Sequence, residues 1–389
     1  MKKRKYRVLV VGHTYVVGLN QAKLEEIARR GRVDLGLVVP KRWYSRDFGT
    51  TYELERVSPN IEYYPLAARI NSRPGGYFLS LRALERTLRN FRPDLVHVEQ
   101  EAFSLAAFET AVVCSARGAP FSLFCWQNVP RRVGLLRRCT RRYVARRASA
   151  LVAGNSGAAK LVMGWGYRGP VEIMPQLGVD TSLFFPRRKP QEPTFRVGFV
   201  GVLSYRKGVD VLLEAGALLR NEGRAIRVAV VGSGPWEKAL RIQAERSGMN
   251  SFIEWRGWVP HSRVPEEVAR MDALVLPTRT IPGDAEQLGH VLLEAMAMGV
   301  PVVGSSCGEI PNVIGRPDLI FGENDPDGLS RILRRLMDDG QWRREVIDYG
   351  LARVQQCFSN SVIAERLESV WIRVLSPENR RQMPVALAQ

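Results

Sequence analysis

Several residue types and patterns are scarce in this sequence, and each absence argues against a class of protein. The chain has five cysteines among 389 residues, an odd number with no CxxC pair. That pattern argues against both a disulfide framework and a structural zinc site. No uninterrupted apolar run reaches the ~18 residues that a transmembrane helix needs. The first apolar run, VLVV, is about half as long as the apolar core of a secretory signal. We therefore expect a first buried strand there, in a protein of the reducing cytoplasm.

Acidic residues are scarce relative to basic ones. The chain has 57 Lys and Arg against 39 Asp and Glu, which gives a net charge of +18. Such an excess favours an anionic partner: nucleic acid, an anionic membrane surface or phosphorylated small molecules. The helix-turn-helix, RRM-type and zinc-finger patterns of nucleic-acid-binding proteins are absent, so no nucleic-acid partner is expected. A dinucleotide dehydrogenase is also disfavoured, because the first strand leads into GHTYVVG rather than GxGxxG.

Short apolar runs alternate with helix-length amphipathic stretches along almost the whole chain. VDLGLVVP and IRVAVVG are examples of the apolar runs, and Ala22–Arg30 and Asn360–Leu375 are examples of the helical stretches. Continuous apolar strands that alternate with helices are typical of parallel sheets covered on both faces. The alternation stops at PRRKPQEPT, a proline-rich charged segment that suits a linker, and restarts directly after it.

We therefore expect an α/β protein with two doubly wound domains and a terminal helix that returns to the first. The predicted segments are residues 1–186, a linker at 187–194, residues 195–359, and the helix at 360–378. Ligands of such sheets bind beyond the carboxyl ends of the strands. Functional residues are therefore expected in the loops that follow strands.

The most informative stretch is DAEQLGHVLLEAMAMGVPVVGS, residues 284–305, in which Glu286 and Glu294 stand eight positions apart around Gly289. It follows the apolar strand ALVLP, and a helix is predicted from about Leu288. Eight residues of helix span ~12 Å, about the reach of a sugar-diphosphate-ribose unit, so one carboxylate could hold hydroxyls at each end. The helix N-terminus between them offers amides and a positive dipole end to a diphosphate. Gly289 would let phosphate oxygens approach the backbone.

The Glu286-x7-Glu294 pattern resembles the signature of retaining GT-B glycosyltransferases of family 4, and the resemblance covers nearly the whole chain. GFVGVLSYRKGVDVLLEA, VVGSGP, WRGWVP and MPQLGVDTSLFFP also match that family in place. The resemblance implies a GT-B fold, in which two Rossmann-like domains face a central cleft. It further implies a hexosyltransferase that uses a nucleoside-diphosphate sugar. The expected acceptor is a saccharide or lipid-linked glycan of cell-surface polysaccharide synthesis.

The resemblance also implies roles for individual residues. Glu294 would bind the nucleotide ribose, and Lys207 would neutralise the diphosphate leaving group, where charge develops in the transition state. Glu286 would hold the donor sugar and its phosphate. The backbone amides that assist Glu286 would be those of Gln287, Leu288, Gly289 and His290.

Three further positions would border the donor. Trp258 and Val259 would edge the base, and Gly18 would approach the diphosphate from the N-terminal domain. In such enzymes the departing phosphate itself takes the proton of the acceptor. That would explain why no pair of carboxylates is spaced for ordinary glycoside hydrolysis. No metal and no cofactor beyond the donor are expected.

The sequence departs from the family pattern at the phosphate loop and at the sugar end of the site. Val202 stands where the family often has an arginine, and Arg206 is expected to compensate. His290 replaces a usual aliphatic residue and could either donate to phosphate or lie exposed at the helix end. Glu99 stands where a second histidine often follows the position of His97.

His97 ends a strand and is either a catalytic residue or a hydrogen-bonded core histidine. A family histidine that contacts the donor sugar would fall near Trp126 or Gln127. The sugar and acceptor end of the site is therefore the part that transfers least from the family.

The segment PRRVGLLRRCTRRYVARRASA holds eight arginines between Arg131 and Arg147. Leu135, Leu136, Cys139 and Tyr143 recur there at helical spacing, opposite much of the arginine. Such a run is often a solvated helix face, but its density favours contact with an anionic surface, the inner leaflet of a membrane. We therefore expect a cytoplasmic protein that associates peripherally with the inner leaflet.

Two alternatives stay open at this point. The first is another GT-B enzyme, such as a nucleotide-sugar epimerase, which would release no free nucleotide beyond hydrolysis. The second is a nucleic-acid-binding protein, which the net charge alone would also suit. For single residues, Glu286 could be a helix N-terminal acid. Lys207 is unfavourable as a plain helix-start residue, because the helix dipole disfavours cations there.

Overall fold

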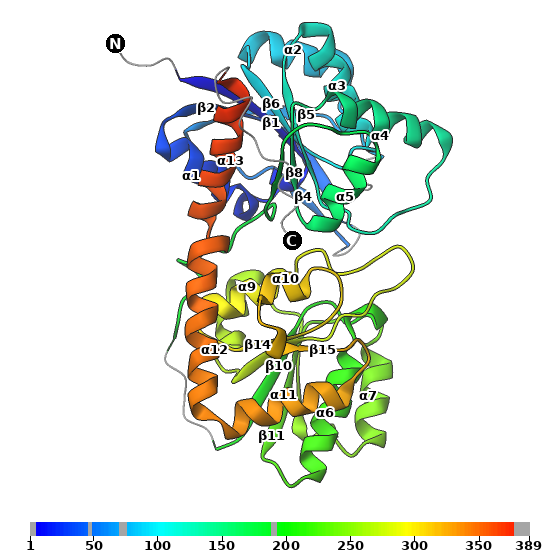
Figure 1. Cartoon of the computed structure of the whole chain (residues 1–389), viewed down its shortest axis with the longest axis vertical. Coiled ribbons are helices and arrows are strands. Elements are labelled where there is room, and N and C mark those ends of the chain that lie inside the picture. The colour runs from blue at the N-terminus through cyan, green and yellow to red at the C-terminus, as the bar shows by residue number, and fades with distance from the viewer. Residues whose placement is uncertain (1–4, 46–48, 70–75, 188–192, 377–389) are drawn as a thin grey trace. The chain divides into compact units, whose positions relative to one another are not determined.

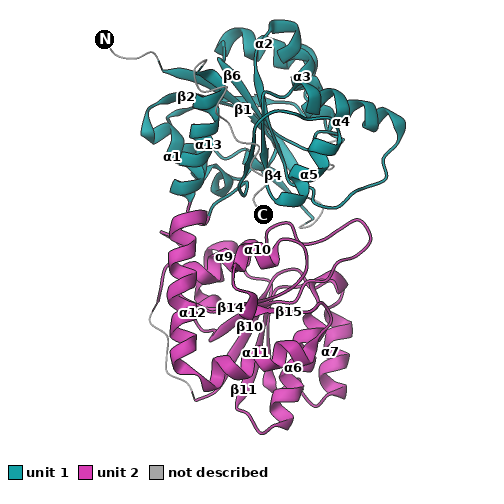
Figure 2. Ribbon diagram, viewed as in Figure 1, with its two compact units in different colours: residues 1–178, 360–389 teal, residues 179–359 magenta. Residues whose placement is uncertain are grey.

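The computed structural model describes residues 5–45, 49–69, 76–187 and 193–376. The chain forms two compact units, shown in different colours in Figure 2: residues 1–178 with 360–389, and residues 179–359. Residues 179–186, assigned to the first domain from the sequence, are grouped with the second unit. Residues 188–192 of the expected linker and 377–378 of the expected terminal helix lie outside the described residues.

The first unit is built on a seven-stranded parallel sheet with the strand order β5-β2-β1-β6-β7-β8-β9. Strands β1, β2 and β6 are mostly buried, because helices cover both faces of the sheet (Figure 1). A separate antiparallel pair, β3 with β4, follows β2. The bounds are β1 Tyr6–Gly12, β2 Val33–Pro40, β3 Arg42–Ser45, β4 Thr50–Glu53, β5 Ile61–Leu66, β6 Leu95–Glu99, β7 Phe121–Cys125, β8 Ala150–Ala153 and β9 Val171–Ile173.

The helices of the first unit start and stop at residues suited to caps. Ser104 and Asn155 each accept a backbone hydrogen bond at the start of α3 and α5, and Gly31 and Gly118 end α1 and α3 in the left-handed conformation. The terminal helix α13 packs on α1. The bounds are α1 Ala22–Arg30, α2 Leu81–Phe91, α3 Leu105–Arg117, α4 Leu135–Arg147, α5 Ser156–Gly164 and α13 Asn360–Leu375.

The second unit is built on a six-stranded parallel sheet with the order β12-β11-β10-β13-β14-β15. The strand order reverses between β10 and β13, which are neighbours in the sheet. In a doubly wound sheet this reversal opens a crevice at the carboxyl ends of the two strands. The bounds are β10 Phe195–Val200, β11 Ile226–Val231, β12 Ile253–Gly257, β13 Ala273–Leu276, β14 Val302–Ser305 and β15 Ile320–Phe321.

Helices cover both faces of the second sheet as well (Figure 1). A π-helical turn, Val354–Phe358, follows α12. The prediction of two doubly wound Rossmann-like domains is therefore confirmed for each unit. The bounds are α6 Val209–Asn221, α7 Glu237–Arg246, α8 Val264–Val268, α9 His290–Ala297, α10 Ile310–Ile314, α11 Pro326–Asp338 and α12 Gly340–Arg353.

Candidate functional site

Two loops meet at the carboxyl ends of β10 and β13, where the second sheet reverses its strand order. Residues 201–208 follow β10, and residues 277–289 follow β13. Their contact depends on Gly208, which has a φ of +66°, and whose added Cβ would lie 2.0 Å from the carbonyl oxygen of Pro277. Only glycine fits a left-handed position this close to another backbone. The contact places Lys207, the preceding residue, beside the second loop.

Arg279 joins the same two loops through both its backbone and its side chain. Its backbone N–H donates to the carbonyl of Arg206 at 2.8 Å. Its guanidinium donates to both carboxylate oxygens of Asp210 at 2.7 Å and lies 4.4 Å from the centre of the Tyr205 ring. Arg279 is 4% exposed, so this is a buried ion pair with good geometry. The ion pair fixes the loop of residues 201–208, the candidate phosphate-binding loop, against the loop that follows β13.

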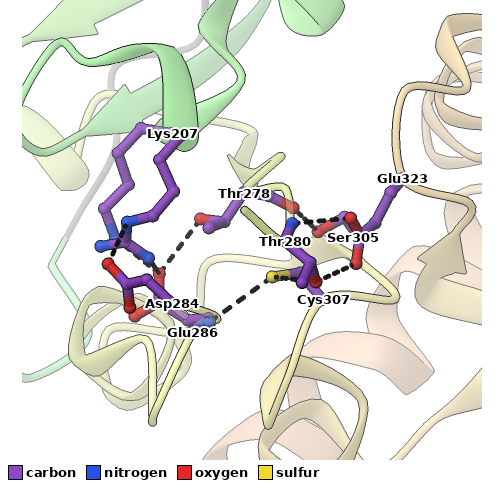
Figure 3. A network of polar contacts seen from close by, with 9 residues as sticks. Lys207, Thr278, Thr280, Asp284, Glu286, Ser305, Cys307 and Glu323 are labelled. Carbon is purple, nitrogen blue, oxygen red and sulfur yellow. Dashed lines mark hydrogen bonds and ion pairs between the residues drawn. The ribbon is translucent and has the colours of Figure 1, made fainter. Parts of the chain in front are cut away.

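Glu286 lies at the centre of this loop cluster, as Figure 3 shows. Its Oε2 accepts from Lys207 Nζ at 2.5 Å and from Thr278 Oγ1 at 3.1 Å. Arg206 Nη1 lies 3.6 Å from the same oxygen, and Arg206 Nε lies 3.3 Å from Asp284 Oδ2. Burial by itself would raise the pKa of Glu286, but Lys207 and Arg206 lower it below its usual value. The structure thus brings together three of the four residues predicted to be catalytic.

The backbone of Glu286 is held as firmly as its side chain. Its N–H donates to Cys307 Sγ at 3.4 Å, and its carbonyl accepts from the N–H of Glu309 at 3.0 Å. An added Cβ on Gly308, φ +56°, would lie 2.1 Å from that carbonyl oxygen. Three loops, which follow β10, β13 and β14, therefore fix Glu286.

A second set of contacts continues from Cys307 toward the end of β15. The Sγ of Cys307 lies 3.5 Å from Thr280 Oγ1. Thr280 in turn donates to the Glu323 carboxylate from its backbone N–H and its hydroxyl, each at 2.7 Å (Figure 3). Cys307 was not among the residues predicted for the site. The available signal was its position directly after a buried strand.

The helix after this loop begins two residues later than predicted, at His290 rather than near Leu288. Gly289 is its N-cap with a φ of +72°, and an added Cβ would lie 2.7 Å from Leu276 Cδ2. Residues 286–289 are therefore not helical, and the rise of 1.5 Å per residue does not apply to them. Glu294 is the fifth residue of α9, little more than one turn from its start.

Glu294 is buried and takes part in a separate polar cluster. His261 Nε2 lies 2.8 Å from Glu294 Oε1, and His290 Nδ1 lies 3.4 Å from the same oxygen. Burial by itself would raise the pKa of Glu294, but His261 and His290 lower it to about 2. The hydrogen bond to Glu294 raises the pKa of His261, whose ring packs edge-on against Phe184. His261 was not among the residues predicted for the site, although it is the last residue of the WVPH segment that follows β12.

The other donor-site candidates of the second unit line its carboxyl edge. Trp258 is 65% exposed directly after β12, and Val259 is half-buried. Gln287 and Leu288 are half-buried in the loop that leads to α9. Val202, where the family has an arginine, is 40% exposed. An exposed indole at a strand end offers an apolar face to a planar ligand.

In the first unit, Gly18 was predicted to approach the diphosphate, and its backbone amide is already hydrogen-bonded. The N–H of Gly18 donates to Glu55 Oε2 at 2.6 Å, and an added Cβ would lie 2.5 Å from Val57 Cγ1. The amide is thus oriented to bind an anionic oxygen, here a carboxylate. A diphosphate oxygen at Gly18 would have to replace that of Glu55.

His97 is fully buried in β6 with both ring nitrogens hydrogen-bonded. Nδ1 lies 2.8 Å from Ser122 Oγ, and Nε2 lies 3.2 Å from Glu99 Oε1. Glu99 also pairs with the buried Lys23 at 2.6 Å, and the pair holds the pKa of Glu99 far below its usual range despite burial. Burial lowers the pKa of His97. These contacts are those of a satisfied core histidine.

Trp126 and Gln127, near which a sugar-contacting histidine was expected, are held by a buried acid. Their backbone N–H groups donate to Glu101 Oε1 at 2.9 and 2.8 Å. Burial raises the pKa of Glu101 to about 7, against the effect of these bonds. Its other oxygen, Oε2, is buried without a hydrogen-bond partner, which suits a protonated carboxyl group.

Residues 5–45, 49–69, 76–187 and 193–376 contain no group of three or more His, Cys, Asp or Glu side chains that is placed to hold a metal ion. No helix in the same ranges combines the length and the apolar content needed to cross a bilayer.

Each half of the chain matches a family model. Residues 194–339 match the model described as glycosyl transferases group 1, and residues 21–176 match the model described as a glycosyl transferase 4-like domain. Together the two models match most of the sequence.

Curated relatives and solved structures agree with these matches. The 2-deoxystreptamine N-acetyl-D-glucosaminyltransferase of Streptomyces fradiae is 28% identical over 67% of this chain and 66% of its own. The O-antigen chain mannosyltransferase B of Escherichia coli is 32% identical over 43% of this chain and 45% of its own. Several curated relatives are matched over about half of their own length. The solved structure of Anabaena HepE in complex with UDP has a TM-score of 0.69 at 16% identity, covering 94% of this chain and 99% of that one.

Proposed function

The chain belongs to the glycosyl transferases group 1 family, and on that premise we propose that it is a retaining glycosyltransferase. It transfers a hexosyl unit from a nucleoside-diphosphate sugar to an acceptor. The observation that carries this proposal is the cluster of Glu286, Lys207 and Arg206 at the carboxyl ends of β10 and β13. An acid and two cations at this reversal point suit a ligand with hydroxyls next to a diphosphate.

The donor is held at two places in the second unit. Glu294 accepts hydrogen bonds from the ribose hydroxyls, because it stays ionised and is oriented by His261. Glu286 accepts from hydroxyls of the sugar, with the amides at the start of α9 on the phosphate. Trp258 and Val259 border the base. The contribution of Gly18 to the diphosphate site stays a prediction.

Catalysis rests on stabilising the leaving group. Lys207 lies beside the expected diphosphate position, and a cation fixed there lowers the cost of the charge that develops as the glycosidic bond breaks. Arg206 adds a second cation; its buried Nη1 makes no hydrogen bond. This arrangement supports Arg206 as the substitute for the arginine that Val202 replaces. The departing phosphate then takes the proton of the acceptor, so the reaction needs no metal and no further cofactor.

The acceptor is a saccharide or a lipid-linked glycan of cell-surface polysaccharide synthesis. The relatives support this class, because one of them is named for the O-antigen chain. We place the enzyme in the cytoplasm, at the inner leaflet, where lipid-linked acceptors would be available. A nucleotide-sugar epimerase would use the same fold but would not transfer the sugar to an acceptor, and product analysis separates the two.

The test is calorimetric titration of UDP, GDP and ADP into the full chain with a metal chelator present. We expect saturable binding of one nucleotide, weakened about tenfold to a hundredfold in Glu294→Gln, because a charge-assisted hydrogen bond is lost. Glu266→Gln, at an exposed surface ion pair with Arg263, is the matched control. Equal affinity of wild type and Glu294→Gln, or no binding of any nucleotide to folded protein, would overturn the donor-site assignment.

A further inference from the structure

The arginine-rich helix α4 is attached to the first unit mainly by its second half. Thr140, Val144 and Ala145 are its buried residues. The Tyr143 ring packs against that of Phe108 on α3, with 5.5 Å between centroids. Figure 1 shows α4 beginning at the outer edge of the first unit, after a long connection from β7. The first half of α4 is therefore accessible to a binding partner.

That first half exposes two adjacent leucines. Leu135 and Leu136 are 77% and 76% exposed, more than any other large hydrophobic side chain in the described ranges. All residues from 134 to 139 are exposed. Of the four residues predicted on the apolar face of α4, Tyr143 packs on the first unit, whereas both leucines and Cys139 are exposed. Two adjacent leucines with this exposure form an apolar surface whose contact with water is unfavourable.

Uncompensated positive charge surrounds these leucines. The segment from Arg131 to Arg147 contains no Asp or Glu. In the part of the chain that the structure describes, none of the seven arginines from Arg132 onward is within ion-pair distance of an acid. The pKa of Arg141 is lowered by burial and then by repulsion from Arg138 and Arg142. The N-terminus of α4, which has no acid in its first turn, adds the positive end of the helix dipole.

We propose that the first half of α4 docks on an anionic lipid bilayer, with Leu135 and Leu136 in the interface and the neighbouring arginines on lipid phosphates. The two leucines favour a bilayer over nucleic acid, because lipid accepts apolar side chains and cations on one surface. A nucleic-acid backbone would accept only the arginines. This surface lies outside the proposed donor site, so its test needs neither donor nor acceptor.

The experiment is co-sedimentation of the full chain with vesicles of phosphatidylcholine alone and of phosphatidylcholine with phosphatidylglycerol. Wild type should bind the anionic vesicles. Each charge removed in Arg137→Gln/Arg142→Gln should weaken binding about fivefold. This difference from wild type should disappear in 1 M salt, where the screening length is ~3 Å. Leu135→Gln/Leu136→Gln should weaken binding at least tenfold, both with and without 1 M salt. Because all four side chains are exposed, folding should not change.

Matched controls are Arg246→Gln/Arg344→Gln, two exposed arginines of the second unit, and Leu81→Gln, an exposed leucine of α2. Both should bind vesicles like wild type. Nucleotide affinity should be unchanged in every variant. A failure of the transferase proposal is therefore distinguishable from a failure of the membrane proposal. No binding of wild type to anionic vesicles, or equal losses in test and control variants, would overturn the proposal. So would binding to duplex RNA that is salt-sensitive but indifferent to the leucine substitutions.

Discussion

Lys207 Nζ lies 2.5 Å from Glu286 Oε2, although the two residues are 79 positions apart in sequence. The cation proposed for the diphosphate is thus paired with the carboxylate proposed for the sugar. The pair keeps Glu286 ionised in a buried position, since Lys207 lowers the pKa that burial would raise. Each partner therefore prepares the other for a ligand that carries both hydroxyls and phosphate.

Replacing Glu286 by glutamine should lower turnover far more than nucleotide binding. Glutamine keeps the shape but removes the negative charge and frees Lys207 for the diphosphate. We expect kcat to fall about 10²- to 10³-fold, the usual effect of removing one precisely placed polar group, while nucleotide affinity does not fall. Steady-state kinetics and titration of the same preparation measure both quantities, with Glu266→Gln as control. A loss of nucleotide affinity at unchanged kcat would contradict this role.

Gly289→Ala should destabilise the second unit through two separate effects. The φ of +72° costs an alanine about 1–2 kcal/mol, and its Cβ would lie 2.7 Å from Leu276 Cδ2. Gly223→Ala is the matched control, because Gly223 has a φ of +80° with no atom within 4 Å of an added Cβ. Denaturant unfolding should show a larger loss for Gly289→Ala than for Gly223→Ala. Equal losses would mean that the contact with Leu276 relaxes without cost.

His261→Gln should remove a pH dependence of stability. The folded-state pKa of His261 is raised above 6.5 by Glu294. Its stabilising effect is therefore fully present below pH 6.5 and is lost as pH rises through the raised pKa. Glu294, with a pKa of about 2, does not titrate in that range. Thermal unfolding from pH 6 to 9 should show a steeper decline for wild type than for His261→Gln; parallel curves would contradict the coupling.

Glu101→Gln should stabilise the first unit at high pH only. The pKa of Glu101 is raised from 4.5 to about 7, so the folded state binds more protons than the unfolded state between these values. Stability then falls as pH rises through that window, by up to about 3 kcal/mol. Glutamine resembles the protonated acid and can still accept from Trp126 and Gln127. Wild type and variant should unfold alike at pH 4.5, and the variant should be the more stable at pH 8. If wild type were as stable as the variant at pH 8, Glu101 would not be held in its neutral form.

Local pattern was enough to predict much of the fold. Ala22–Arg30 and Asn360–Leu375 are helices with the bounds that their periodicity indicates, and VDLGLVVP is β2 from end to end. These elements depend on neighbours close in sequence and on burial of one face or both. The strand β5, the short strand β15 and the hairpin of β3 and β4 were missed. β5 is an edge strand in which only the first residue is buried, so it has no continuous apolar run. β15 has only two residues, too few for a pattern, and in β3 and β4 the pairing itself defines the strands.

The sequence by itself determined the class of the protein: two doubly wound domains, with a glutamate and a lysine in loops that follow strands and a second glutamate eight positions after the first. Only the tertiary structure decided which side chains meet. It paired Lys207 with Glu286, brought His261 to Glu294, and placed the Cys307 sulfur on the backbone of Glu286. It also buried His97 among hydrogen-bond partners and left Leu135 and Leu136 exposed. The physical reason is that periodicity reports burial along one element, whereas a contact between loops depends on how strands are ordered in a sheet.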